Sequence, residues 1–202
     1  MTRRELLQAA ALSGAAAANG SGSTLEVPVL RVIDKYARAS SRQIGEFLGT
    51  IWADAVRVFA KGGILLRVTE RTGEVLQYPS GKPLFRGLER GMINVVVSDR
   101  VPLDWDKGRS LAGVSALYEG YCVCAISMNE AHGNRIPFLA VNTVVHELLH
   151  VLLQDVFGAR TGAVQATGAE ARVDLYATEL WLFGDGAAVR ELGRGCVERL
   201  RG

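Results

Sequence analysis

The sequence predicts an α+β fold in which a small twisted mixed sheet packs against long helices, within one domain spanning residues 25–202. Runs rich in Val and Ile are typical of strands, whereas apolar residues elsewhere recur every three or four positions, as in helices. Hydrophobic residues make up 49% of the 202-residue chain, which is enough for a sizeable core. The formal net charge of +2 is too small to indicate a nucleic-acid partner.

The first 18 residues combine a charged start with a short apolar run and small residues, which is typical of an export signal. Thr2-Arg3-Arg4, followed by Leu6-Leu7, resembles a twin-arginine signal, which implies passage through the twin-arginine export machinery. The apolar run is too short to form a stable membrane span. We therefore expect cleavage near Ala18, a flexible leader over residues 19–24, and a periplasmic or extracellular protein. The alternative is an amphipathic helix that begins the domain.

A strand and a long helix are predicted next. The strand covers residues 25–34, and Pro28 marks either an edge position or the first residues of the strand. Ser40 and Gln43 can form a capping box, after which apolar residues keep helical spacing as far as Gly62. This pattern predicts a long amphipathic helix.

The chain then predicts three further strands. Residues 64–70 form a strand, residues 71–74 a turn that contains a glycine, and residues 75–78 a short return strand. Residues 79–91 are predicted to be a loop, because they contain proline, glycine and several charges. The run of residues 92–98 is dense enough in Val and Ile for a strand in the interior of the sheet.

Residues 99–111 are predicted to be irregular, and Trp105 there either borders a cleft or covers the edge of the core. Residues 121–128 predict another strand. The loop after this strand carries His132, which is a loop residue, a contact at the rim of a site, or a group that polarises substrate.

Three cysteines are expected to be small core residues. Cys122 and Cys124 share one face of the predicted strand, and Cys196 lies near the C-terminus. A disulfide from one of the pair to Cys196 is the alternative. We do not expect them to be zinc ligands, because the sequence has no pair of cysteines or histidines at a spacing that would complete a zinc site with them.

The most informative feature is the H-E-x-x-H motif of residues 146–150, within an almost wholly apolar segment predicted to be one central, buried helix over residues 137–158. Residues four apart lie on one helix face, so the imidazoles of His146 and His150 can bind one metal ion. Glu147 lies about 100° round the helix, where it can face a water molecule on that ion. This layout is typical of hydrolytic zinc sites. The alternative is two core histidines bonded to the backbone and a solvent-facing glutamate.

A tetrahedral catalytic zinc site takes a third protein ligand. Glu170 follows His150 by 20 residues on a second predicted helix, residues 169–183, and Asp174 lies four residues further on the same face. H-E-x-x-H, a spacer and E-x-x-x-D together resemble the gluzincin metallopeptidases, the thermolysin-like branch of the zincins. The resemblance implies that His146, His150 and Glu170 bind Zn2+ and that Asp174 accepts a hydrogen bond from the ring of His146.

Other third ligands are weaker candidates. The metzincin pattern requires a glycine and then a histidine or aspartate where this chain has Leu153 and Val156. Asp155 and Glu179 are rotated away from the metal-binding faces of their predicted helices. For Glu170 itself, the alternative is an ordinary solvated acidic helix face.

By the same resemblance, the chain is an exported zinc metallopeptidase that acts on a peptide or protein substrate, with a zincin-like fold and a small helical C-terminal subdomain. Glu147 is then the general base, and residues 121–128 are the sheet edge that binds extended substrate. No histidine follows His150, and Tyr176 is the only later tyrosine, so the oxyanion-stabilising group stays open, with three arginines as candidates: Arg172, Arg190 and Arg194. The alternatives are a zincin-fold metal-binding or structural protein without peptidase activity, and an exported domain that binds no metal.

Overall fold

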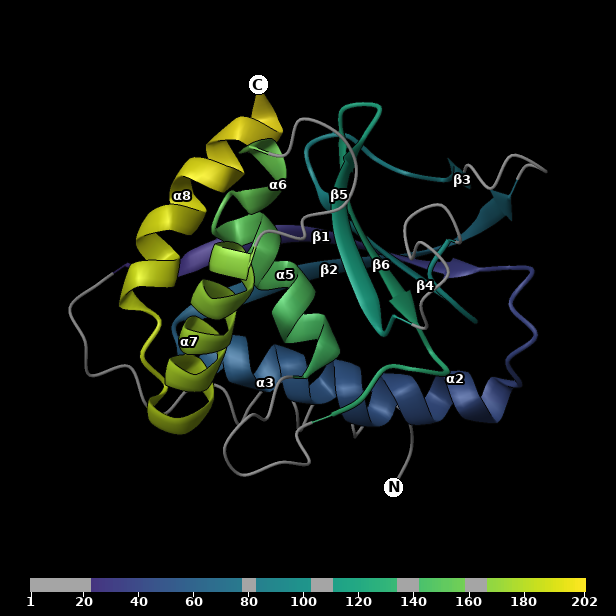
Figure 1. The fold of residues 1–202 in the computed structure, drawn as a ribbon, viewed down its shortest axis with the longest axis horizontal. Helices are drawn as coiled ribbons and strands as arrows, with labels where there is room; N and C mark the ends of the chain where they lie inside the picture. Colours follow the sequence, from purple (N-terminus) through teal and green to yellow (C-terminus); the bar gives the residue numbers. More distant parts are fainter. Residues whose placement is uncertain (1–22, 78–82, 103–110, 134–141, 159–166) are drawn as a thin grey trace.

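The computed structural model of the chain describes residues 23–77, 83–102, 111–133, 142–158 and 167–202 (Figure 1). The predicted signal peptide, all but the last two residues of the predicted leader, Trp105 and Pro137 lie outside these residues. Within the described ranges, no helix is both long and apolar enough to cross a membrane.

In the described part of the chain, six strands form one mixed sheet: β1 (Leu25–Asp34), β2 (Ile64–Gln77), β3 (Pro83–Arg86), β4 (Ile93–Ser98), β5 (Gly113–Tyr118) and β6 (Tyr121–Ser127). Their order across the sheet is β3-β2-β1-β4-β6-β5. The four inner strands run parallel, whereas β3 and β5 are antiparallel to their neighbours at the two ends of the sheet. The expected mixed sheet with helices is therefore confirmed, and it is compatible with the α+β class.

The sheet curls so that its two ends meet. The rings of Phe85 on β3 and Tyr118 on β5 lie 5.0 Å apart in an edge-to-face arrangement. The Tyr118 hydroxyl also donates a hydrogen bond to the Pro83 carbonyl at 3.4 Å. This curl encloses a smaller core cluster on the face of the sheet that includes Leu30 and Val32.

Helices cover the other face of the sheet (Figure 1). Between β1 and β2, α2 (Ser41–Phe47), a π-helical segment η1 (Leu48–Trp52) and α3 (Ala53–Lys61) run on from one another as the predicted long helix. The predicted capping box is present, since Gln43 N–H donates to Ser40 Oγ at 3.3 Å and Ser40 N–H donates to Gln43 Oε1 at 2.9 Å. The helices that the structure describes after β6 are α5 (Thr143–Leu152), α6 (Asp155–Gly158), α7 (Thr167–Phe183) and α8 (Ala187–Arg201).

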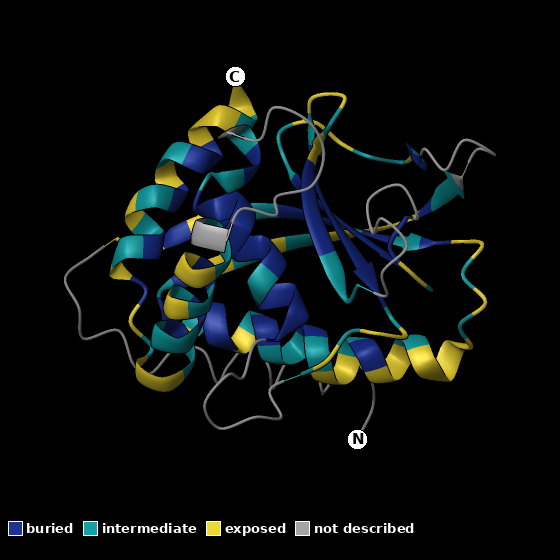
Figure 2. Cartoon of the chain, viewed as in Figure 1, coloured by how far each residue is buried: buried dark blue, intermediate teal, exposed yellow. Residues whose placement is uncertain are grey.

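Helix α5 is the central helix of this layer, as predicted. It packs against α3, α7, α8, β5 and β6, and every one of its residues except His146 is buried (Figure 2). Leu148 and Leu149 are wholly inaccessible, and burial of such side chains stabilises a fold by about 1.5–3 kcal/mol each. The ionisable groups of α5 are thus held in a largely apolar surrounding.

Alternation along β1 divides the core between the two faces. Val27 and Val29 face the helices, whereas Leu30 and Val32 face the curled side. Pro28 lies where only β2 pairs with β1, because the register with β4 begins at Val29. The missing N–H of Pro28 therefore removes no bond to β4, which accords with its prediction as an edge position.

The predicted turn over residues 71–74 is wrong, because β2 continues without interruption through it. This strand pairs in parallel with β1 as far as Gly73 and then with β3 from Glu74 onward. A Cβ atom at position 73 would clash with the Val32 side chain and lie 2.6 Å from the Arg86 carbonyl oxygen. Gly73 is therefore needed for the close approach of β2 to β1 and β3. The prediction that residues 79–91 form a loop is also wrong in part, because β3 lies within them.

The prediction that residues 121–128 form the sheet edge is also wrong. β6 is paired on both sides, with β4 and with β5. Glu119 and Gly120, with φ angles of 47° and 81°, make the two-residue turn that joins β5 to β6. Among the described strands, the outermost one on this side of the sheet is therefore β5, a short strand that the sequence pattern did not reveal.

The motif helix is shorter than predicted. Asn142 caps its start, since the Asn142 Oδ1 atom accepts hydrogen bonds from the N–H groups of Val144 and Val145 at 2.9 and 3.2 Å. At its other end the helix stops at Leu152, and Gln154 takes a φ of 65° before α6 begins. A single helix through residue 158 is thus replaced by two helices at an angle.

The three cysteines are buried and free, which confirms their expected place in the core. Burial raises the pKa of Cys122 to about 11 and that of Cys196 to about 12. His132 is an exposed loop residue whose backbone N–H donates to the Thr143 hydroxyl at 3.1 Å. Its contribution to the helix layer is therefore a backbone contact at the start of α5.

Candidate metal centre

Three side chains from two helices converge on one point. His146 and His150 come from α5 and Glu170 comes from the first turn of α7, and one ligand atom from each lies within 4.8 Å of the others. The two Nε2 atoms are 3.1 Å apart. Glu170 Oε2 lies 3.0 Å from His146 Nε2, and Glu170 Oε1 lies 3.3 Å from His150 Nε2. The structure thus brings together all three residues that the sequence predicted as metal ligands.

These distances fit a divalent metal ion. Bonds of 2.0–2.1 Å in a tetrahedral zinc site place neighbouring ligand atoms roughly 3.3 Å apart, close to the three separations in the cluster. The two Nε2 atoms, 3.1 Å apart, both lie where they could bind the same ion. Two histidines and a carboxylate form a ligand set that catalytic zinc prefers, so the residues present fit the ion.

Electrostatics within the cluster link the histidines to the carboxylate. Hydrogen bonds from His146 and then His150 hold the pKa of Glu170 well below its ordinary value. Burial disfavours the charged form of His150, but its hydrogen bond to Glu170 and the negative charge of Glu147 outweigh that effect and raise its pKa. Glu170 is therefore ionised at neutral pH and can act as an anionic ligand.

Each imidazole has a carboxylate behind it. Asp174 Oδ1 lies 3.5 Å from His146 Nδ1, in the place that the sequence predicted. Asp155 Oδ2 lies 3.2 Å from His150 Nδ1, a contact that the sequence did not predict. On a continuous helix, Asp155 would point away from the metal-binding face of α5. The left-handed backbone conformation of Gln154 turns the chain so that Asp155 lies next to His150.

Glu147 lies on the side of α5 that faces the sheet. It is only 6% exposed, and burial raises its pKa above the ordinary value. The Ser115 hydroxyl on β5 lies 2.7 Å from Glu147 Oε2 and 2.8 Å from the Glu147 carbonyl oxygen. At Gly113, a Cβ atom would lie only 2.8 Å from Glu147 Oε1, so the absence of a side chain there leaves room for the carboxylate. No motif in the sequence indicated Ser115 or Gly113, because their strand was not predicted.

The three arginines considered for oxyanion stabilisation have other contacts. Arg172 forms an ion pair with Asp155, and Arg190 donates to the Gly62 carbonyl. Arg194 donates to the Ser23 hydroxyl at 2.8 Å. Of the described residues that could hold a metal, only His146, His150 and Glu170 form a cluster, and Asp155 and Glu179 are not part of it.

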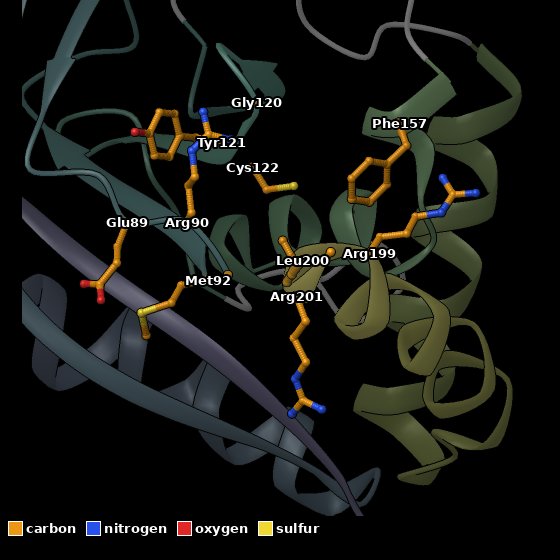
Figure 3. A pocket seen from close by; sticks show the side chains of 12 residues that line it. Glu89, Arg90, Met92, Gly120, Tyr121, Cys122, Phe157, Arg199, Leu200 and Arg201 are labelled. Atoms are coloured by element: carbon orange, nitrogen blue, oxygen red, sulfur yellow. The ribbon is translucent and has the colours of Figure 1, made fainter.

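A separate cavity of about 350 Å³ lies between the start of β4, the β5–β6 turn, α6 and the end of α8. Figure 3 shows Arg90 beside Tyr121 on one wall and Arg199 beside Phe157 on the other. These guanidinium groups lie 4.9 and 5.2 Å from the two ring centroids, so both are engaged in cation–π contacts. The cavity contains no member of the metal cluster.

No family model, no curated protein and no solved structure matches this chain.

Proposed function

We propose that the chain is an exported zinc-dependent metallopeptidase with a zincin-like fold of the gluzincin type. The observation that carries the proposal is the convergence of His146 Nε2, His150 Nε2 and a Glu170 oxygen within 4.8 Å, from two helices, beside the buried carboxylate Glu147. The donor set and the spacing between its atoms fit zinc, and three protein ligands are the number that a catalytic zinc ion would take. Export rests on the twin-arginine-type sequence at the start of the chain.

In this proposal the residues of the chain have separate roles. A bound zinc ion supplies Lewis acidity toward water and toward the scissile carbonyl. Glu147 takes a proton from the attacking water and passes it to the leaving amine, and its raised pKa suits both steps. Ser115 holds one oxygen of Glu147, so the other oxygen, beside Gly113, is the one that meets the water. Asp174 orients His146.

The substrate strand in this proposal is β5. Among the described strands, β5 pairs only with β6, so one row of its backbone N–H and C=O groups faces away from the sheet. The strand also carries Ser115 and Gly113, which contact the proposed general base. An extended peptide that pairs with β5 is thereby brought next to Glu147.

Two substitutions test the proposal. We expect Glu147→Gln to retain bound zinc and to lose peptide hydrolysis, because the amide cannot accept the proton from water. We expect Glu170→Ala to lose zinc on dialysis, because one of three ligands is removed. Glu179→Gln, on the same helix as Glu170 but outside the cluster, serves as the control for both zinc content and turnover. Hydrolysis that persists in Glu147→Gln contradicts the mechanism, and unchanged zinc content in Glu170→Ala contradicts the ligand set.

A second function is a metal-binding protein of the same fold that does not cleave peptides. The 6% exposure of Glu147 and its hydrogen bond from Ser115 favour this function, since a general base must reach water. Incubating the purified protein with a mixed peptide library, with and without a chelator, separates the two. Chelator-sensitive cleavage supports the peptidase, and zinc binding without cleavage supports the second function.

A further inference from the structure

Asp155 occupies an unexpected position relative to His150. On a continuous helix, a residue five positions after His150 would lie about 140° round the axis, away from the metal-binding face. The chain instead leaves the helix at Leu153, and Gln154 takes a φ of 65°. This turn places Asp155 Oδ2 3.2 Å from His150 Nδ1.

The Asp155 carboxylate is almost wholly enclosed, because its side chain is 5% exposed. A buried carboxylate is costly unless it is paired, and here its second oxygen pairs with the guanidinium of Arg172 on α7. The same guanidinium donates to the Leu153 carbonyl at 3.3 Å. Arg172 thus fixes both the carboxylate and the turn that carries it.

Helix α8 also contacts the turn between α5 and α6. The Gln154 side-chain amide donates to the Leu192 carbonyl at 3.1 Å. Phe157 on α6 packs beneath the guanidinium of Arg199, as Figure 3 shows. The position of Asp155 is therefore determined by contacts with α7 and with α8.

A neutral imidazole carries its proton on one nitrogen only. A carboxylate at Nδ1 keeps the proton there, so the lone pair stays on Nε2, which faces His146 and Glu170. We propose that Asp155, held by Arg172, is a positioning residue that fixes the tautomer and ring orientation of His150 for metal binding. This inference rests on the metal site of the proposed function, but it does not require peptide hydrolysis.

The two carboxylates next to the Nδ1 atoms of the histidines, Asp155 and Asp174, differ in distance and in exposure. Asp155 approaches its histidine to 3.2 Å at 5% exposure, whereas Asp174 approaches its histidine to 3.5 Å at 44% exposure. Solvent and salt screen the exposed pair more strongly. The effect of Asp155 on the metal is therefore the larger of the two.

The first measurement is zinc affinity by competition with a chromophoric chelator, on the full purified protein. We expect Asp155→Ala to weaken binding by about 10- to 100-fold and Asp155→Asn, which keeps an oxygen acceptor, to weaken it less. Asp174→Asn is the matched control and should weaken binding less than Asp155→Asn does. Arg172→Gln should also weaken binding, because it removes the ion pair that holds Asp155, and urea unfolding of this variant checks that the fold is kept.

The second measurement is the tautomer of His150, from long-range ¹⁵N–¹H spectra of the chelator-treated protein at alkaline pH. We expect the Nδ1–H form in wild type and in Asp155→Asn, and a mixture in Asp155→Ala. An Asp155→Ala protein with zinc affinity within about twofold of wild type and an unchanged tautomer overturns the inference. If wild type binds no zinc, both the proposed function and this inference fail. If zinc binds without peptidase activity, only the catalytic proposal fails.

Discussion

Gly113→Ala tests whether the position of Glu147 governs catalysis. A Cβ atom built at position 113 lies 2.7 Å from Glu147 Cγ, 2.8 Å from Oε1 and 3.0 Å from Cδ. Non-bonded carbon atoms prefer about 3.5–4.0 Å, so the Glu147 side chain or the β5 backbone has to move by roughly 1 Å. The three atoms nearest to this Cβ all belong to Glu147.

The expected magnitudes follow from this displacement. Overpacking costs about 1–3 kcal/mol, and the smaller unfolded-state entropy of alanine offsets about 0.4–1 kcal/mol of it, so we expect a net loss of up to roughly 2.6 kcal/mol in unfolding free energy. A misplacement of about 1 Å at a catalytic group lowers kcat/KM by about 100-fold. Zinc content should stay at the wild-type level.

The assay combines zinc content, urea unfolding and kcat/KM on a peptide that the wild type cleaves. Gly45→Ala is the matched control, because nothing lies within 4 Å of a Cβ there and Gly45 is exposed on α2. That variant should gain about 0.5–1 kcal/mol of stability and keep its activity. A Gly113→Ala protein with wild-type stability and kcat/KM within about threefold refutes the reasoning, since Glu147 would then tolerate the displacement.

Two further predictions concern pH and the β5–β6 turn. In chelator-treated protein, the lowered pKa of Glu170 means that its ionised form stabilises the fold above pH 4.5, and this stabilisation is lost as the pH falls through the lowered pKa. The raised pKa of His150 means that its charged form stabilises the fold below pH 6.5, and this stabilisation is lost as the pH rises through the raised pKa. The excess Tm of wild type over Glu170→Gln should therefore peak between pH 4.5 and 6.5, and a flat difference from about pH 3 to 9 would contradict it. Glu119, with its φ of 47°, stands where a type I′ turn prefers asparagine, so Glu119→Asn should raise the unfolding free energy by roughly 0.5–1 kcal/mol. A lower urea midpoint for Glu119→Asn would show that its side chain stabilises the turn.

Local signals in the sequence predicted most elements, and the failures have physical reasons. The capping box at Ser40 and the dense Val and Ile run of β4 depend on neighbouring residues only, so they were readable from the chain. Gly73 indicated a turn, although it serves a close approach between strands that are distant in sequence. β3 and β5 are short edge strands whose pairing depends on the curl of the sheet, which no local pattern reveals.

The candidate site divides in the same way. His146 and His150 share a face by helix geometry alone, and Glu170 was placed by its resemblance to a known spacing. Asp155 could not be placed, because its contact depends on the left-handed conformation of Gln154, which is not a glycine or an asparagine. A non-glycine residue in that conformation leaves no clear signal in the sequence.

Exposure divides the cluster into an enclosed side and an open side, and this determines how a ligand can approach. His150 and Glu147 are 2% and 6% exposed, and each is held by a neighbour in the fold, so neither can move without breaking a buried contact. The side chains of His146, Glu170 and Asp174 are 19%, 42% and 44% exposed. In the proposed function, a metal ion would therefore enter along α7, whose side chains can adjust in solvent, while α5 keeps the geometry of the enclosed side fixed.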